Sequence, residues 1–378
     1  MIIVHYGELA LKGKNRSQFE KLLRKNIEAK IPDAKTKMDM GHINVETTIS
    51  NKKAIEILTK IPGIEYFSFA EQAELSIESI NKVGLKVAKA FQKNNDVKTF
   101  KITTKRRYKD TELDTPTINN KVGFHIGDKL NVPARMKDPD LDLKVEIVKD
   151  AAYISTEDIR GVGGFPVNPE QKIVALLSGG FDSPVAAYQL IRRGCEVILV
   201  HFQNKNTLTK AVQDKVEKLA KQLSKFQTKT TLYIVHFEDI QKDIIKDVKA
   251  DYRMLIYRGV MLRIAEGIAQ KHKARFLITG DALSQVASQT INNLEAVYPS
   301  VDMRIFTPLI GFDKNDILKI AKKIGTYEIS NLPYGDCCSY FVPEHPKLKA
   351  RKEEVQHILD KVKVDVVKEI KESDVQIY

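Results

Sequence analysis

Three kinds of feature are missing from the 378-residue sequence, and each absence excludes a class of protein. No apolar run approaches the length of about 18 residues that a membrane-spanning helix needs. The apolar stretch before His5 and Glu8 is too short for a signal peptide. The chain has only three cysteines, which are too few for a disulfide framework and lack the spacing of zinc ligands. We therefore expect a cytoplasmic protein with no membrane segment.

Positive charge exceeds negative charge in this chain. It has 61 lysine and arginine residues against 49 aspartate and glutamate residues, which gives a formal net charge of +12. A basic balance of this size favours a polyanionic partner without identifying one. A general richness in lysine explains it equally well. The length exceeds that of one ordinary hydrophobic core, so two or three domains are expected.

Short apolar runs alternate with helical stretches in the second half of the sequence. The expected strands are residues 172–177, 197–202, 231–237 and 275–280, and the clearest helices are residues 209–225 and 252–272. Near the end, Asp313 caps a further helix that Gly325 closes. Continuous apolar strands separated by helices are typical of a parallel sheet that is covered on both faces. The sequence therefore predicts a doubly wound α/β domain.

The first 165 residues alternate strands and helices on a smaller scale. Strands at 2–7, 36–40 and 42–49 with helices at 17–31 and 52–61 are typical of an α+β unit of the ferredoxin-like type. After Gly63 the pattern restarts, with strands at 66–75, 99–109 and 142–156 and a long helix at 76–94. Glycines at 161–164 followed by Pro166 are typical of a linker. We therefore expect three parts, residues 1–62, 63–165 and 170–378.

The strand at 99–109 is unusually basic. Alternation places Phe100, Ile102 and Thr104 on one face, and the other face carries most of the cations. The basic residues are Lys101, Lys105, Arg106, Arg107 and Lys109. Such a strand is suited to a phosphate backbone, and the resulting affinity would depend on salt. An edge strand kept soluble by lysine has the same pattern, and the sequence leaves both interpretations open.

A loop suited to phosphate follows the first strand of the α/β domain. It contains Ser178, Gly179, Gly180, Asp182 and Ser183, and a helix is expected to begin near Pro184. Backbone N–H groups at such a turn, together with the serine hydroxyls, can hold an anion. The loop lacks the lysine with which a Walker P-loop reaches the β- and γ-phosphates. A different phosphate bond is therefore a candidate for cleavage.

The segment SGGFDS, residues 178–183, resembles the signature of the N-type ATP pyrophosphatases, the PP-loop enzymes. Those enzymes cleave ATP between the α- and β-phosphates and transfer AMP to a substrate oxygen. The alternative is an ordinary glycine turn between a strand and a helix. The segments YGELALKGKNR, TGDALSQVASQT, PLIGFDKNDI and LPYGDCCSYFVPEHP are similar to those of the ThiI-type tRNA 4-thiouridine synthetases.

The resemblance covers essentially the whole chain and implies a ferredoxin-like domain, a THUMP domain and a PP-loop domain in that order. The sequence ends at Tyr378 without the rhodanese domain that some members carry, so we expect a short form. The two front domains are expected to hold the acceptor end of tRNA and to bring the uridine at position 8 to the ATP site. The basic strand is the expected tRNA contact.

The resemblance also implies which residues bind ATP and Mg²⁺. The expected ATP-binding residues are Leu176, Leu177, Ser178, Gly179, Gly180, Asp182, Ser183, His201, Phe202, Arg258, Gly280 and Gln289. Asp182 is the candidate contact for Mg²⁺ on the nucleotide, and Lys314 matches a lysine that the family needs for adenylation. Two alternatives stay open: Gly280 as a turn glycine and Arg258 as part of a surface ion pair.

The expected chemistry needs a sulfur nucleophile. Uracil O4 is a poor leaving group, so AMP is first transferred to it and sulfur then attacks C4. Cys337 and Cys338 are the candidate thiols, and the sequence does not decide which of them acts. They are also compatible with two buried small residues, while Cys195 is expected to be structural. We expect the sulfur to come from a cysteine desulfurase or another donor. The sequence leaves open a role in making the thiazole of thiamine. It also leaves open whether the protein forms a homodimer.

Two other functions are compatible with parts of the sequence. A PP-loop synthetase acting on a small molecule would explain residues 170–310 and leave the basic front half without a role. An RNA-binding module with a degenerate nucleotide site would leave the intact SGGFDS segment unexplained.

Overall fold

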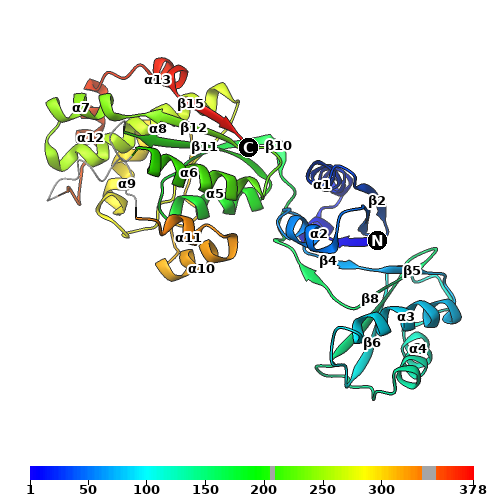
Figure 1. The fold of residues 1–378 in the computed structure, drawn as a ribbon. Coiled ribbons are helices and arrows are strands. Elements are labelled where there is room, and N and C mark those ends of the chain that lie inside the picture. The colour runs from blue at the N-terminus through cyan, green and yellow to red at the C-terminus, as the bar shows by residue number, and fades with distance from the viewer. Residues whose placement is uncertain (205–208, 334–345) are drawn as a thin grey trace. The chain divides into compact units, whose positions relative to one another are not determined.

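The computed structural model describes residues 1–204, 209–333 and 346–378. The chain forms two compact units, Met1–Pro166 and Val167–Tyr378 (Figure 1). Each unit has its own sheets and its own hydrophobic core. Among the helices that the structure describes, none combines the length and the apolar composition needed to cross a membrane.

The first part of the first unit is a five-stranded antiparallel sheet with two helices. Its elements are β1 (Ile2–His5), the 3-10 helix η1 (Glu8–Leu11), α1 (Arg16–Lys30), β2 (Lys35–Asp39), β3 (His42–Glu46), α2 (Asn51–Leu58), β4 (Tyr66–Phe69) and β9 (Ile159–Arg160). The strand order is β2-β3-β1-β4-β9. Leu23 and Ile27 of α1 are fully buried against it. This arrangement confirms the predicted ferredoxin-like fold.

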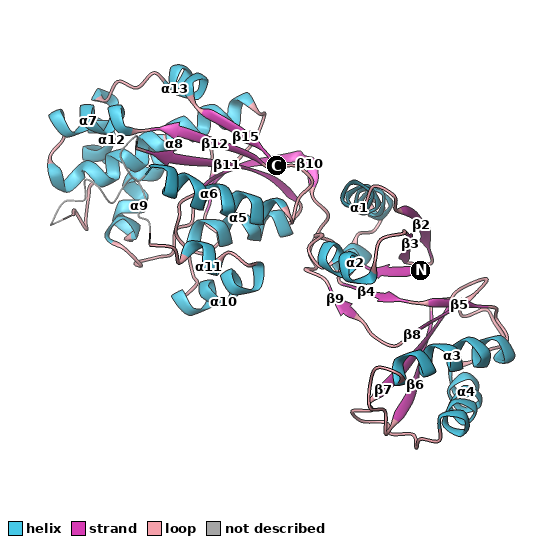
Figure 2. Cartoon of the chain, in the orientation of Figure 1, coloured by secondary structure: helices cyan, strands magenta, loops and turns pink. Residues whose placement is uncertain are grey.

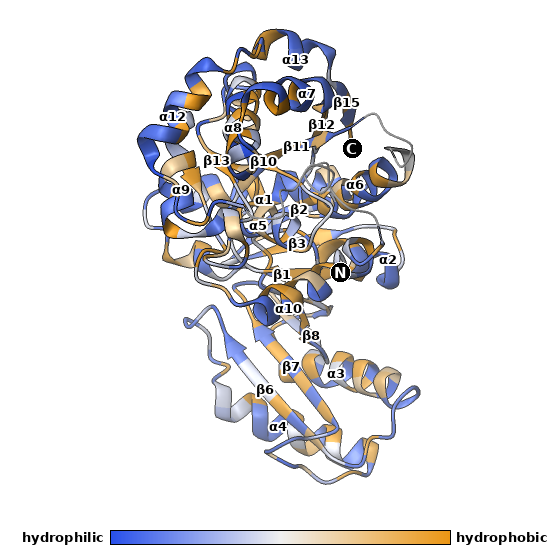
Figure 3. Cartoon of the chain, turned by 90° about the vertical axis from the view of Figure 1, so that its left-hand side faces the viewer, coloured by the Kyte–Doolittle hydropathy of each residue, from blue (hydrophilic) through white to orange (hydrophobic). Residues whose placement is uncertain are grey.

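The second part of the first unit has a separate four-stranded sheet in the order β5-β8-β7-β6 (Figure 2). Its elements are β5 (Glu71–Ala73), α3 (Ile77–Gln92), β6 (Phe100–Arg106), α4 (Thr115–Leu130), β7 (Leu141–Ile147) and β8 (Ala152–Ser155). Strand β6 runs parallel to β7, and the other pairs are antiparallel. Hydrophobic and hydrophilic residues alternate along β7, so one face of the sheet is buried (Figure 3).

Helix α4 was absent from the elements expected from the sequence. It contains two glycines, Gly123 and Gly127, which weaken a helical pattern. A Cβ added at Gly127 would lie 3.1 Å from the Phe100 ring, so close packing against β6 explains one of them. Asp114 caps the helix by accepting a hydrogen bond from the Thr117 N–H, and the buried stripe of the helix begins at Ile118.

The second unit is a six-stranded sheet surrounded by helices. Its elements are β10 (Asn168–Leu176), α5 (Asp182–Arg192), β11 (Cys195–Gln203), α6 (Thr209–Ser224), β12 (Thr231–His236), α7 (Glu238–Asp247), η2 (Ala250–Tyr252), α8 (Arg253–Lys271), β13 (Leu277–Ile278), η3 (Ala287–Gln289), α9 (Ile291–Val297), η4 (Tyr298–Ser300), β14 (Ile305–Phe306), α10 (Lys314–Ile324), α11 (Tyr327–Ser330), α12 (Lys352–Lys361), α13 (Val366–Glu372) and β15 (Asp374–Ile377). The strand order is β14-β13-β10-β11-β12-β15, and only β15 pairs antiparallel with its neighbour among these strands. The predicted doubly wound α/β fold is confirmed.

Helices cover both faces of this sheet. Val174, Val200 and Val235 point to the face on which α7 and α8 pack, and α5 and α6 contact the strands from the other side. Helix α10 begins after Asp313 and ends at Gly325, which adopts a left-handed φ of 73°, as the sequence predicted. Helix α5 begins at Asp182, two positions earlier than expected, and this places the phosphate-loop carboxylate in its first turn.

Candidate functional site

A pocket of about 300 Å³ opens at the carboxyl ends of β10, β11 and β13. The strand order reverses at β10, and such a switch point is where open parallel sheets bind ligands. All the residues predicted to bind ATP line this pocket except Gly179 and Gly180, which lie in the adjoining loop. The pocket is also lined by residues that the sequence analysis did not select: Val200, Met254, Met261, Thr279, Asp281 and Ser288.

The loop between β10 and α5 is held by its own two serines. The Ser183 hydroxyl accepts a hydrogen bond from the Ser178 N–H at 2.8 Å and lies 3.0 Å from the Ser178 hydroxyl. The Ser178 hydroxyl also accepts from the Gly180 N–H at 3.2 Å. The Ser330 hydroxyl donates to the Gly180 carbonyl at 2.9 Å. The loop is therefore shaped by its serines at the amino end of α5, where the helix dipole favours an anion.

Gly280 is required by a close approach of two backbones. A Cβ at this position would lie 2.8 Å from the Ser183 nitrogen and 2.9 Å from its Cα. Neither backbone atom can move without displacing the start of α5. The segment after β13 therefore packs directly on the loop between β10 and α5. Gly280 is needed for this close packing, and a role in a turn alone does not account for it.

Asp182 and Lys314 come together at the mouth of the loop. The Lys314 ammonium donates to the Asp182 carboxylate at 2.9 Å, and the Gln285 amide donates to the same carboxylate at 2.9 Å. The ammonium also lies over the Phe181 ring, 5.3 Å from its centroid. Lys314 is at the first position of α10, where the helix dipole disfavours a cation. The nearby carboxylate and ring offset this. Two of the four residues predicted to be catalytic, Asp182 and Lys314, therefore meet beside the pocket, and the other two lie outside the described residues.

Arg258 forms a buried ion pair inside the pocket wall. Its guanidinium donates to both oxygens of Asp281 at 2.7 Å and to the Ser288 carbonyl at 2.8 Å. Asp281 is 4% exposed and also accepts from the Tyr298 hydroxyl at 2.8 Å. Burial alone would raise the pKa of Asp281, but the Arg258 charge and several hydrogen bonds lower it below its ordinary value. Arg258 thus joins three segments of the wall, and the surface-pair alternative does not describe it.

The side of the pocket formed by β11 is mostly apolar. Phe202 is buried, with its ring edge-on to Phe237 at 5.4 Å between centroids. His201 is also buried, and its Nδ1 lies 2.9 Å from the Leu177 carbonyl oxygen. Met254 adds an adaptable thioether to the lining. This side suits a flat, weakly polar ring, and the opposite side carries the phosphate loop.

The cysteines divide into two cases. Cys337 and Cys338, the candidate thiols, lie outside the described residues. Cys195 is half-buried at the start of β11, and burial raises the pKa of its thiol to about 11. A thiol with so high a pKa is a poor nucleophile near neutral pH, which agrees with a structural role.

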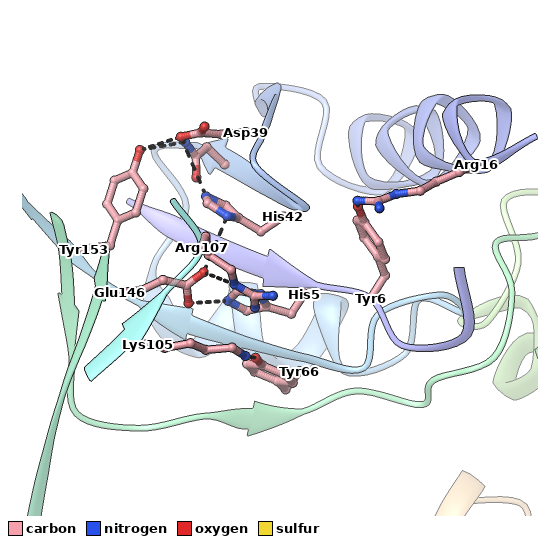
Figure 4. A network of polar contacts seen from close by, with 11 residues as sticks. His5, Tyr6, Arg16, Asp39, His42, Tyr66, Lys105, Arg107, Glu146 and Tyr153 are labelled. Carbon is pink, nitrogen blue, oxygen red and sulfur yellow. Dashed lines mark hydrogen bonds and ion pairs between the residues drawn. The ribbon is translucent and has the colours of Figure 1, made fainter. Parts of the chain in front are cut away.

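The five cations of the basic strand have different surroundings. Lys101 pairs with Asp142 at 3.4 Å, and Arg107 donates to Glu146 at 2.8 Å. The Lys105 ammonium lies 3.1 Å from the Tyr66 hydroxyl, Arg106 donates to the backbone carbonyls of Lys109 and Thr111, and Lys109 is exposed. Lys105 and Lys109 are therefore the most accessible of the set, while Arg107 is paired with the partly buried carboxylate of Glu146 (Figure 4).

Three family models match the chain in sequence. The model described as the thiamine biosynthesis protein ThiI matches residues 169–364, the ThiI ferredoxin-like domain matches residues 1–68, and the THUMP domain matches residues 74–157. Together they cover most of both compact units and agree with the three kinds of domain expected from the sequence.

Several proteins are similar to this chain over nearly their whole length. A probable tRNA sulfurtransferase of Caldanaerobacter subterraneus subsp. tengcongensis is 41% identical over 366 residues, or 96% of this chain and 95% of that protein. One from Bacillus pumilus is 38% identical over 94% of this chain and 89% of that protein. The crystal structure of a 4-thiouridine synthetase–RNA complex with bound ATP superposes with a TM-score of 0.90, at 33% identity, covering 100% of this chain and 98% of that one.

Proposed function

We propose that this chain, which belongs to the ThiI family, is an ATP-dependent tRNA sulfurtransferase that converts a uridine of tRNA to 4-thiouridine. One observation carries the proposal beyond family membership. The residues selected from the sequence for nucleotide binding converge on one pocket at the switch point of the sheet, with Asp182 and Lys314 at its mouth.

The pocket suits ATP in one orientation. The adenine would lie against the apolar side formed by Phe202 and Met254. The phosphates would then reach the loop at the amino end of α5, where Ser178 and Ser183 lie. The α-phosphate would come closest to Lys314, because that ammonium is held beside the loop. Lys314 can therefore stabilise the negative charge that develops on phosphate during the reaction.

Magnesium fits this donor set as a nucleotide-bound ion. No group of three histidine, cysteine or acidic side chains able to hold a metal occurs within the part of the chain that the structure describes. Mg²⁺ commonly uses one or two carboxylates together with substrate phosphates. Asp182 offers such a carboxylate at the loop, and it would exchange its contacts with Lys314 and Gln285 for the ion. The ion would supply charge neutralisation for the phosphates.

The reaction divides into two displacements. Uracil O4 attacks the α-phosphorus of ATP, the bond to the β-phosphate oxygen breaks, and pyrophosphate leaves. A sulfur nucleophile then attacks C4 of the adenylated uracil, and AMP leaves with the former O4. We assign the sulfur to a persulfide on Cys337 or Cys338, loaded by a cysteine desulfurase, or to sulfide from another donor. Attack of a persulfide on C4 forms a C4–S–S–cysteine linkage. The thiol of the second cysteine then attacks the sulfur of the first, the outer sulfur stays on C4, and the two cysteines form a disulfide that an external thiol must reduce before the next turnover. Sulfide attacks C4 directly and needs no reductant. The first unit would hold the acceptor end of tRNA, so that the uridine at position 8 enters the pocket.

One experiment tests the proposal directly. The protein is incubated with tRNA, ATP, Mg²⁺ and a sulfide source, and the nucleosides of the recovered tRNA are analysed by mass spectrometry. We expect 4-thiouridine among these nucleosides, with AMP and pyrophosphate as the other products. Pyrophosphate release that a metabolite drives in the absence of RNA would favour the small-molecule synthetase instead. Formation of ADP and orthophosphate would contradict the mechanism.

A further inference from the structure

The two sheets of the first unit meet through a cluster of charged and titratable side chains. We call this cluster the joint; it consists of His5, Asp39, His42, Arg107 and Glu146 (Figure 4). The ferredoxin-like sheet contributes the histidines and Asp39, and the THUMP sheet contributes Glu146 from β7 and Arg107 just beyond β6. None of these residues lines the nucleotide pocket.

Glu146 is the centre of the joint. Its Oε2 lies 3.3 Å from Nε2 of His5, and its Oε1 lies 3.6 Å from Nδ1 of His42 and 2.8 Å from Nε of Arg107. Arg107 also reaches Nδ1 of His5 at 3.0 Å. Burial by itself would raise the pKa of Glu146, but the contacts with His5 and Arg107 outweigh it and lower the pKa to about 2. Glu146 is therefore charged throughout the physiological range.

His42 is enclosed between two carboxylates without a hydrogen bond. It is 0% exposed, and neither ring nitrogen has a hydrogen-bond partner among residues 1–204, 209–333 and 346–378. Glu146 lies at 3.6 Å and Asp39 at 3.9 Å, while His5 and Arg107 add positive or potentially positive charge nearby. The Tyr153 ring meets the His42 ring edge-on at 5.6 Å. Burial is the largest influence on His42 and lowers the pKa of its imidazole from 6.5.

Few apolar side chains pack at the joint, so polar contacts do much to hold the two sheets together. Only a minor cluster that includes Ile3, Val148 and Tyr153 bridges the two large cores of the described first unit. The Tyr153 hydroxyl accepts from the Asn44 amide at 2.9 Å. Next to the joint, Lys105 of β6 lies 3.1 Å from the Tyr66 hydroxyl of β4. The end of the basic strand is thus tied to the ferredoxin-like sheet at several points.

We propose that Glu146, His5 and His42 are positioning residues for tRNA binding. They fix the two sheets of the first unit in one arrangement while His42 is uncharged. When His42 is protonated, that arrangement is released. The proposal rests on the proposed function, because it takes tRNA as the ligand. A proton on His42 would place a charge in a fully buried site. The carboxylates of Glu146 and Asp39, at 3.6 and 3.9 Å, lie beyond hydrogen-bond distance, and their attraction does not offset the cost of burial, so the joint would open to hydrate the charge.

The sign of the pH effect follows from linkage. The imidazole of His42 has a lower pKa in the folded protein than in the unfolded chain, so the unfolded chain binds more protons as the pH falls. The stabilisation of the joint is complete above pH 6.5, the ordinary value for histidine, and decreases as the pH falls below it. Glu146 keeps its charge over this interval. General electrostatics predicts the opposite trend, because the chain has eight histidines and gains positive charge in acid.

The test measures tRNA affinity of the full chain at about pH 7.5 and about pH 5.5, on either side of the ordinary histidine pKa. For the unmodified protein, we expect the affinity to fall about fivefold or more in acid, within the usual range of a coupling between sites. His42→Gln should lose this fall and bind at about pH 5.5 at least as tightly as at about pH 7.5, because only the general gain of positive charge remains. His125→Gln is the matched control, because His125 lies on α4 outside the joint, and it should behave like the unmodified protein. Tighter binding of the unmodified protein in acid, or an undiminished acid effect in His42→Gln, would overturn the proposal.

A second variant separates the joint from the proposed function. Glu146→Gln keeps the shape of the side chain and removes the charge, so hydrogen exchange at about pH 7.5 should accelerate in β1, β3 and β7 and stay unchanged in the second unit. tRNA affinity should fall in parallel. Unchanged exchange or unchanged affinity would count against the joint. If the unmodified protein itself fails to bind tRNA, the proposed function is wrong, and the exchange result still decides whether the joint fixes the two sheets.

Discussion

Two carboxylate–arginine pairs, one in each compact unit, have almost the same donor–acceptor distance and very different surroundings. Arg258 donates to Asp281 at 2.7 Å in the nucleotide pocket, and Arg107 donates to Glu146 at 2.8 Å in the joint. The other partners of Asp281 are uncharged donors, among them the Tyr298 hydroxyl, whereas Glu146 also faces two imidazoles. Only imidazoles change charge between about pH 5 and 8. The Arg258–Asp281 pair therefore keeps its charges across this pH range, whereas the surroundings of the Arg107–Glu146 pair change charge with pH.

The largest effect should come from Asp182→Ala, which tests whether the chemistry belongs to the second unit alone. Without this carboxylate, Lys314 loses its ion-pair partner, and the proposed nucleotide-bound Mg²⁺ would lose its protein ligand. We expect tRNA-dependent pyrophosphate release and 4-thiouridine formation to fall at least about 100-fold, with tRNA affinity unchanged. Asp239→Ala removes the same charge from an 85% exposed side chain on α7 and should retain activity. A mutant at position 182 that still thiolates tRNA would contradict the mechanism.

The next effect concerns the pocket pair itself. Asp281→Asn or Arg258→Gln alone leaves a buried charge without its partner, and each should destabilise the second unit by about 3 kcal/mol and raise the KM for ATP. The double variant should cost less than the sum of the single variants. Hydrogen exchange of the second unit and steady-state kinetics measure both effects. Strictly additive losses would show that the two side chains do not act as a unit.

The Arg258–Asp281 pair and the joint should also differ in how their stability depends on pH. The pKa of Asp281 is lowered from 3.8, so its contribution to stability is present above that value and is lost only as the pH falls below it. The stability of the second unit should therefore not change through this pair between about pH 7.5 and 5.5, where the joint is expected to weaken. An acid loss that disappears in Asp281→Asn would break the comparison.

A smaller effect is expected from the accessible cations of the basic strand. Lys105→Ala combined with Lys109→Ala should weaken tRNA binding several-fold, and each lost phosphate contact should reduce the slope of log affinity against log salt by about 0.9. Arg107 is left unchanged because it belongs to the joint. Lys98→Ala is the control, since this exposed lysine precedes β6 and pairs with Asp96. Unchanged affinity and slope would remove the strand from the tRNA footprint.

Much of the fold could be predicted because its segments follow simple periods. The continuous apolar strands of the second unit and the capped helix between Asp313 and Gly325 were placed correctly. Helix α4 was missed because Gly123 and Gly127 hide its pattern until Phe100 is seen against it. The edge strand β15 was missed because its pairing with β12 depends on residues far apart in the chain.

The site was predictable where a motif lies on one segment and unpredictable where two segments meet. The SGGFDS segment alone was enough to predict the loop between β10 and α5, and the structure shows that residues of this loop line the pocket. Asp281 directly follows Gly280 in a segment already selected, but only the fold shows that it faces Arg258. His42 and Glu146 belong to different sheets and to no motif, so their contact has no sequence signal.

The smallest effect is expected from removing an uncharged hydrogen-bond donor of Asp281. It tests whether such donors, or the charge of Arg258, keep this carboxyl ionised. Tyr298→Phe removes the hydroxyl that donates to Asp281 at 2.8 Å and leaves the ion pair with Arg258 in place. It should destabilise the second unit by about 1 to 2 kcal/mol, the range for a hydrogen bond to a charged group. The loss should be equal at about pH 7.5 and 5.5, because the Arg258 charge still keeps the carboxyl ionised. Tyr188→Phe, a buried tyrosine of α5 outside the pocket lining, provides the control for lost hydroxyls. A loss in Tyr298→Phe that grows in acid would mean that the hydroxyl is what holds Asp281 ionised, and the pocket pair would then be as sensitive to pH as the joint.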